Sequence, residues 1–113
     1  MNTVILSGRV ANDLEVKYTP TQTAALNLVI AIDRGKDKEG KDKGTDFPRV
    51  TVYGKQAENC ALYSEKGKRI AVQGHIQTGS YQKDGKTIYT TDIIADRVEF
   101  LEFKDNGFGE FGF

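Results

Sequence analysis

The sequence is poor in the residues on which several kinds of site depend. It has one cysteine, one histidine and no tryptophan among 113 residues. A single cysteine, Cys60, forms no internal disulfide and supplies no cysteine-rich zinc site, which suits a reducing compartment. His75 has no second ligand at metal-binding spacing, so we expect neither a metal ion nor a cofactor.

Long apolar runs and an excess of one charge are missing too. No stretch approaches the roughly 18 apolar residues of a membrane span, and no basic segment precedes the apolar run near Met1, so we expect no signal peptide and a cytoplasmic location. Sixteen Lys and Arg balance sixteen Asp and Glu. That balance excludes a histone-like basic polymer and an acidic disordered activator. A neutral total can still conceal a local basic strip, so nucleic-acid binding stays open.

Five short runs show the alternation typical of β-strands, and one segment shows helical spacing. The helical segment, Gln56 to Ser64, lies between the third and fourth runs. The pattern predicts an all-β fold, a five-stranded OB-fold Greek-key barrel with one short helix between strands 3 and 4. We expect this domain to cover residues 1–103 and a short flexible C-terminal tail to cover 104–113. The five runs are 4–10, 25–32, 47–53, 69–81 and 87–95.

Two connections between the runs are informative. Asp84-Gly85 is a strong signal for a two-residue hairpin turn. A turn centred there pairs Ile76 with Ile93, which joins two apolar faces, and we expect Ile76 to point into the core. The connection at 34–46 has no apolar residue. We therefore expect it to be a mobile, solvated hairpin loop.

The faces opposite the expected core carry rings and cations. If Val50 and Val52 point inward, then Phe47, Arg49 and Tyr53 point outward. Flat rings stack on unpaired bases, at roughly 1–3 kcal/mol per base, while arginine neutralises phosphate. The candidate nucleic-acid-binding residues are Phe47, Arg49, Tyr53, Lys55, Lys66, Tyr81, Arg34, Lys36 and Lys38.

These rings and cations are also compatible with roles that involve no nucleic acid. Outward rings also fill subunit interfaces, and the lysines of the 34–46 connection alternate with acidic residues, as in an ordinary solvated loop. Cys60 falls on the apolar side of the expected helix, which favours a buried structural thiol over a nucleophile. Because no catalytic constellation is evident, we expect a binding protein and not an enzyme.

Several stretches resemble the bacterial and phage-type single-stranded DNA-binding proteins, in the order that this family has them. They cover residues 2 to about 101 and include NTVILSGR at 2–9, TDFPRVTVYGKQAE at 45–58, GHIQTGSY at 74–81 and YTTDII at 89–94. The resemblance implies an OB barrel that forms a homotetramer and wraps single-stranded DNA during replication, recombination and repair. It also implies that Phe47 takes the place of a base-stacking aromatic, that Tyr53 and Tyr81 are further rings, and that Arg49, Lys55 and Lys66 contact the backbone.

The sequence departs from the family pattern at two places. Arg34-Gly35-Lys36 provides no aromatic where the family often has one. The tail is shorter than the acidic tail with which the family recruits replication and repair proteins. Phe113, at its end, is the candidate residue for binding such partners. An OB-fold RNA-binding protein and a primosome-type protein-interaction module are the alternative functions.

Overall fold

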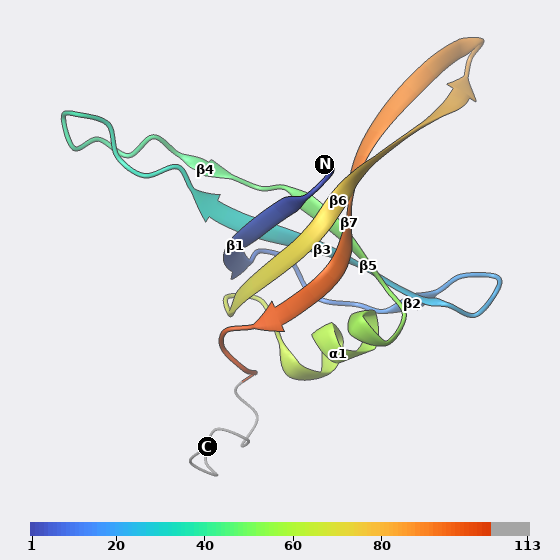
Figure 1. Ribbon diagram of the computed structural model, residues 1–113, viewed down its shortest axis with the longest axis horizontal. Helices are drawn as coiled ribbons and strands as arrows, with labels where there is room; N and C mark the ends of the chain where they lie inside the picture. Colours follow the sequence, from blue (N-terminus) through green and yellow to red (C-terminus); the bar gives the residue numbers. More distant parts are fainter. Residues whose placement is uncertain (105–113) are drawn as a thin grey trace.

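The fold is known from a computed structural model that describes residues 1–104 (Figure 1). Most of the expected tail, with Phe113, lies outside the described residues. All five expected strands and the helix are present, and two short strands, β2 and β4, were not expected. The elements are β1 (Val4–Val10), β2 (Lys17–Tyr18), β3 (Ala24–Asp33), β4 (Thr45–Asp46), β5 (Arg49–Tyr53), α1 (Lys55–Tyr63), β6 (Arg69–Lys83) and β7 (Lys86–Phe100).

The five long strands pair in a closed ring. β1 pairs with β6, β6 with β7, β7 with β5, β5 with β3, and β3 again with β1. Only the β5–β7 pair is parallel. β1 comes very close to β3 at Gly8. A Cβ at this position would lie 2.2 Å from the Ala31 carbonyl oxygen, so the close approach that closes the ring requires a glycine here. This arrangement confirms the predicted OB-fold Greek-key topology.

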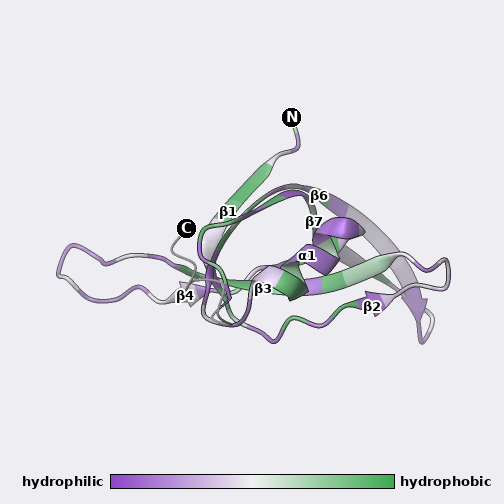
Figure 2. Cartoon of the chain, turned by 90° about the horizontal axis from the view of Figure 1, so that it is seen from below, coloured by the Kyte–Doolittle hydropathy of each residue, from purple (hydrophilic) through white to green (hydrophobic). Residues whose placement is uncertain are grey.

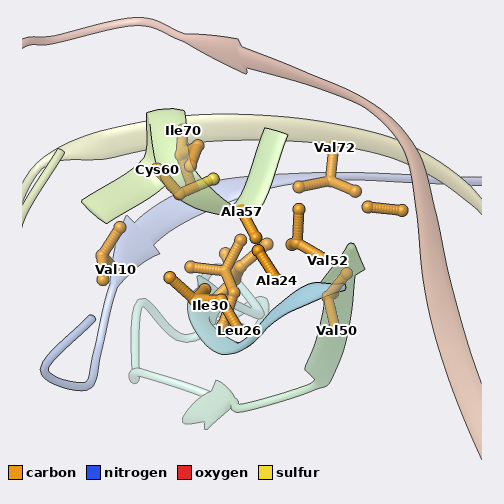
Figure 3. Close-up of a cluster of buried hydrophobic side chains, with 12 residues drawn as sticks. Val10, Ala24, Leu26, Ile30, Val50, Val52, Ala57, Cys60, Ile70 and Val72 are labelled. Carbon is orange, nitrogen blue, oxygen red and sulfur yellow. The ribbon is translucent and has the colours of Figure 1, made fainter. Parts of the chain in front are cut away.

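Alternating side chains of the strands fill the interior of the ring. Leu28 and Ile30 of β3 and Val50 of β5 are fully buried. Helix α1 adds Ala57 and Cys60 to the same cluster (Figure 3). Burial raises the pKa of the Cys60 thiol to about 11, in agreement with the expected structural thiol.

The β6–β7 hairpin continues far beyond the barrel (Figure 1). The predicted register is confirmed, with Ile76 opposite Ile93 and Tyr81 opposite Ile88. Asp84 and Gly85 have φ angles of 51° and 77°, as the predicted turn requires. The expectation that Ile76 lies in the core was wrong: its side chain is 43% exposed, because the two strands leave the barrel at this point.

The segment between β3 and β4 is a second projecting hairpin. Backbone hydrogen bonds hold it, from Arg34 N to Gly44 O at 2.9 Å and from Lys43 N to Gly35 O at 3.0 Å. Its residues are mostly exposed. Figure 2 colours most of this hairpin as hydrophilic. Carboxylates also hold its turns, because Asp37 Oδ1 accepts from Glu39 N and Lys41 N, at 2.8 and 2.9 Å. The expected mobility of the hairpin stays a prediction. Among residues 1–104, no helix is both long and apolar enough to cross a membrane.

Candidate nucleic-acid interface

The outer face of β5 carries a cation between two rings. The pairs Arg49 opposite Val29 and Tyr53 opposite Ala25 alternate with buried residues of β3 and β5, so these side chains face outward. Arg49 is exposed and Tyr53 is about half exposed. Phe47 precedes β5, between it and β4, and is 60% exposed. The three predicted residues thus follow one another along β5 and the residues just before it, and both rings are accessible to solvent.

The β6–β7 hairpin presents rings on both of its faces. Tyr81 lies directly opposite Ile88, whereas Tyr89 lies opposite Ser80 and so points to the other side of the ribbon. Tyr89 is 80% exposed, which makes it more accessible than Tyr81. Tyr89 was not predicted as a site residue. The sequence does carry a signal for it, because a turn centred on Asp84-Gly85 sets the pairing of the two strands and so places Tyr89 opposite Ser80.

Charge divides the two faces of this hairpin. Lys83 and Lys86 pair with each other and share the face of Tyr81. The face of Tyr89 has no charged side chain between residues 78 and 91, where its other members are Thr78, Ser80, Gln82, Thr87 and Thr91. The cations of this hairpin therefore lie on the Tyr81 face, near its tip, whereas Asp92 lies on the same face nearer the barrel.

The remaining predicted lysines occupy different parts of the barrel. Lys55 is the first residue of α1, close behind Tyr53, and it is exposed. Lys66 is exposed in the turn before β6, where Gly67 N donates to Val10 O at 2.8 Å. This turn therefore adjoins the end of β1. No strand pairing of the described residues joins Lys66 to the β3–β5 face.

The cations of the 34–44 hairpin are not equivalent. Arg34 Nη2 lies 2.6 Å from Asp46 Oδ1, and Nε donates to the same oxygen at 3.0 Å. The hydrogen bond from Arg34 lowers the pKa of Asp46 below its usual range, so the carboxylate stays charged. Lys36 and Lys38 are exposed and form no ion pair with any described residue. They are freer than Arg34 to meet a phosphate.

One cation was missed in the prediction. Lys17 of β2 pairs with Ala25 of β3, and Ala25 in turn pairs with Tyr53 of β5. The three side chains therefore form a row across three strands, on the outer face. The strict alternation of charged and apolar residues from Asp13 to Lys17 is the signal that marks this segment as one side of a sheet.

Comparison with known proteins points to one family. The model of the single-strand binding protein family matches residues 1–101. A single-stranded DNA-binding protein of Clostridium tetani is 50% identical over 105 residues, which cover 91% of this chain and 72% of the relative. Single-stranded DNA-binding protein 2 of Clostridium acetobutylicum is 49% identical, with 91% and 78% covered. Single-stranded DNA-binding protein 3 of Listeria innocua is 40% identical, with 96% and 69% covered.

Proposed function

This chain belongs to the single-strand binding protein family, and on that premise we propose that it binds single-stranded DNA without reading its sequence. The observation that carries the proposal is the line formed by Phe47, just before β5, and by Arg49 and Tyr53 of β5, with both rings exposed. We propose that it acts in DNA replication, recombination and repair. In this role it is a binding protein without catalytic activity, and it binds DNA in the cytoplasm.

The line on β5 has the chemistry that an unpaired strand needs. Bases stack on aromatic rings whatever their identity, because every base has a π-face. Arg49 between the rings, and Lys55 beyond Tyr53, supply positive charge for the phosphates. Affinity then comes from stacking and from counterion release, so it falls as salt concentration rises.

The test compares oligo-dT, oligo-U and duplex DNA at one salt concentration, in titrations of the parent and of two variants. Phe47→Ala removes a proposed stacking ring, and we expect it to weaken oligo-dT binding about 5- to 150-fold, equivalent to about 1–3 kcal/mol. Phe103→Ala is the matched control. Phe103 is also an exposed phenylalanine, at 58%, but it packs with Tyr63 and Phe100 away from β5.

Each alternative function has its own outcome in these titrations. Equal affinity for oligo-U and oligo-dT favours an RNA-binding OB protein. Absence of binding to any strand favours a protein-interaction module. If Phe47→Ala and Phe103→Ala bind oligo-dT equally well, the assignment of the β5 rings to stacking is wrong.

We also propose that the chain works as a homotetramer. Family membership supports this proposal, and the exposed Ile5 on the outer face of β1, beside Gln73 of β6, is a side chain that a subunit contact would cover. Light scattering is expected to give the mass of four 12.5 kDa chains. A mass of one chain at micromolar concentration contradicts the proposal.

A further inference from the structure

The β6–β7 hairpin has free strand edges where it projects from the barrel (Figure 1). β1 pairs with β6 only as far as Gly74, and β5 pairs with β7 only at Ile93 and Ile94. Between these points and the turn, each strand of the hairpin pairs only with the other among the described residues. Unpaired edges of this kind are templates for a further strand.

The side chain of Asn2 shows which backbone groups point outward. Asn2 precedes β1, which lies on the side of β6 away from β7. Ile76 N donates to Asn2 Oδ1 at 2.8 Å, and Asn2 Nδ2 donates to Ile76 O at 2.7 Å. The backbone groups of Ile76 therefore point away from β7, and so do those of every second residue toward the turn. On β7, the outward groups belong to the residues opposite these: Thr91, Tyr89 and Thr87.

The free edge of β7 lacks the features that usually prevent strand pairing. No proline, no charged residue and no bulge occurs from Thr87 to Thr91. Thr87, Tyr89 and Thr91 are exposed, and no hydrogen bond outside the β6–β7 ladder reaches their backbone groups among residues 1–104. The edge of β6 differs, because Asn2 already occupies its first position, at Ile76.

This edge is complementary to a second copy of itself. Two antiparallel copies can pair all three outward residues in only one register, which sets Tyr89 opposite Tyr89 and Thr87 opposite Thr91. In that register Lys86 of each copy lies opposite Asp92 of the other, and these are the only charged residues of the run 86–92. Opposite charges at facing positions stabilise an antiparallel pair. One two-fold axis at Tyr89 therefore forms both ion pairs.

We propose that two copies of this chain pair through the free edges of β7, in the antiparallel register centred on Tyr89. The contact makes a four-stranded sheet in the order β6–β7–β7–β6. The two-fold axis is perpendicular to this sheet, so the Tyr81 rings of both copies lie on the same face. A strand bound on that face would pass from one copy to the next. The pairing itself uses protein groups alone and does not depend on the proposed function.

A cysteine trap tests this contact. Cys60, the one cysteine of the chain, is fully buried, so a cysteine added to the hairpin is the reactive one. Tyr89→Cys puts a thiol on the proposed axis, where the two Cα atoms are about 5.5 Å apart and within disulfide range. Ser80→Cys is the matched control, because Ser80 is directly opposite Tyr89 but on β6. In the proposed sheet the two β6 strands are roughly 14 Å apart.

The two cysteine variants are oxidised mildly without DNA, at equal protein concentrations, and the covalent dimer is measured on non-reducing gels. We expect about fivefold or more dimer from Tyr89→Cys than from Ser80→Cys, because only the first places two thiols within disulfide range. Equal yields from the two variants, or no dimer from either, overturn the proposed pairing.

Charge reversal tests the register. In the Tyr89→Cys background, Lys86→Asp sets two acidic residues opposite each other, and Asp92→Lys sets two basic ones. Each single change is expected to lower the dimer yield about threefold or more at low salt. The combination of both restores opposite charges and the net charge of the parent, so the yield is expected to recover. Failure to recover overturns the register. Oligo-dT titration of the parent tests the proposed function separately, so the two failures are distinguishable.

Discussion

The barrel and its two hairpins are ordered by different means. In the barrel, side chains such as Leu28, Ile30 and Val52 are withdrawn from water. In the hairpins at 34–44 and 77–92, order comes from backbone hydrogen bonds and from turn residues with positive φ, such as Gly35 and Gly85. In the 34–44 hairpin the carboxylates of Asp37 and Asp42 also accept hydrogen bonds from backbone N–H groups. Neither hairpin places a side chain in the core cluster, so side chains such as those of Lys36 and Lys38 are available for binding.

The largest expected effect lies in the barrel. Leu28→Ala removes a fully buried side chain and is expected to lower the free energy of unfolding by about 2–5 kcal/mol. In the hairpin, Ile88→Ala removes a half-buried side chain outside the core, and a loss of about 1 kcal/mol or less is expected. Urea denaturation measures both values. Equal losses would show that the hairpin is as tightly coupled to the core as β3 is.

The second expected effect concerns the Cys60 thiol on the buried side of α1. Burial raises the pKa of Cys60 from its ordinary 9.0 to about 11. Between these values the folded chain keeps the thiol proton that the unfolded chain loses, so stability falls as pH rises, by at most about 1.4 kcal/mol per pH unit. Cys60→Ala removes this dependence. Urea denaturation at pH 9 and pH 11 measures the free energy of unfolding of both proteins. Between these two pH values the parent is expected to lose more stability than the variant. If both lose the same amount, the thiol is not buried.

The third prediction separates the two faces of the β6–β7 hairpin. Tyr81→Ala is expected to weaken oligo-dT binding about 5- to 150-fold, since Tyr81 shares its face with Lys83 and Lys86. Tyr89→Ala, on the uncharged face, is expected to change the affinity by less than about twofold, because no phosphate is drawn to that face. Fluorescence anisotropy with a labelled oligonucleotide measures both. The assignment fails if Tyr89→Ala has the larger effect.

The smallest expected effect is a change of salt dependence in the 34–44 hairpin. Lys38→Gln is expected to reduce the slope of log affinity against log salt by about one, if Lys38 contacts one phosphate. Arg34→Gln is expected to reduce it by less, because Asp46 already holds the guanidinium. Titrations at several salt concentrations give both slopes, and a larger change for Arg34 would show that DNA displaces Asp46.

Much of the fold could be predicted because its signals are local. The period-two alternation identified the core residues of β3 and β5, and Asp84-Gly85 set the hairpin register through to Ile76 and Ile93. The exposure of Ile76 could not be predicted in this way. Alternation assigns a side of the strand, but it carries no information on where a strand leaves the barrel.

The candidate site likewise has a part that local sequence signals predict and a part that only the tertiary structure decides. The outward direction of Arg49 and Tyr53 followed from the chain itself, because neighbouring side chains on a strand must point to opposite faces. Phe47 is exposed as expected, but it precedes the strand, which begins at Arg49. The partners of these residues depend on which strands meet. The row of Lys17, Ala25 and Tyr53 joins residues of three strands, and the ion pair of Arg34 with Asp46 joins the two ends of a hairpin. Only the pairing of strands in the closed ring and its hairpins could bring these residues together.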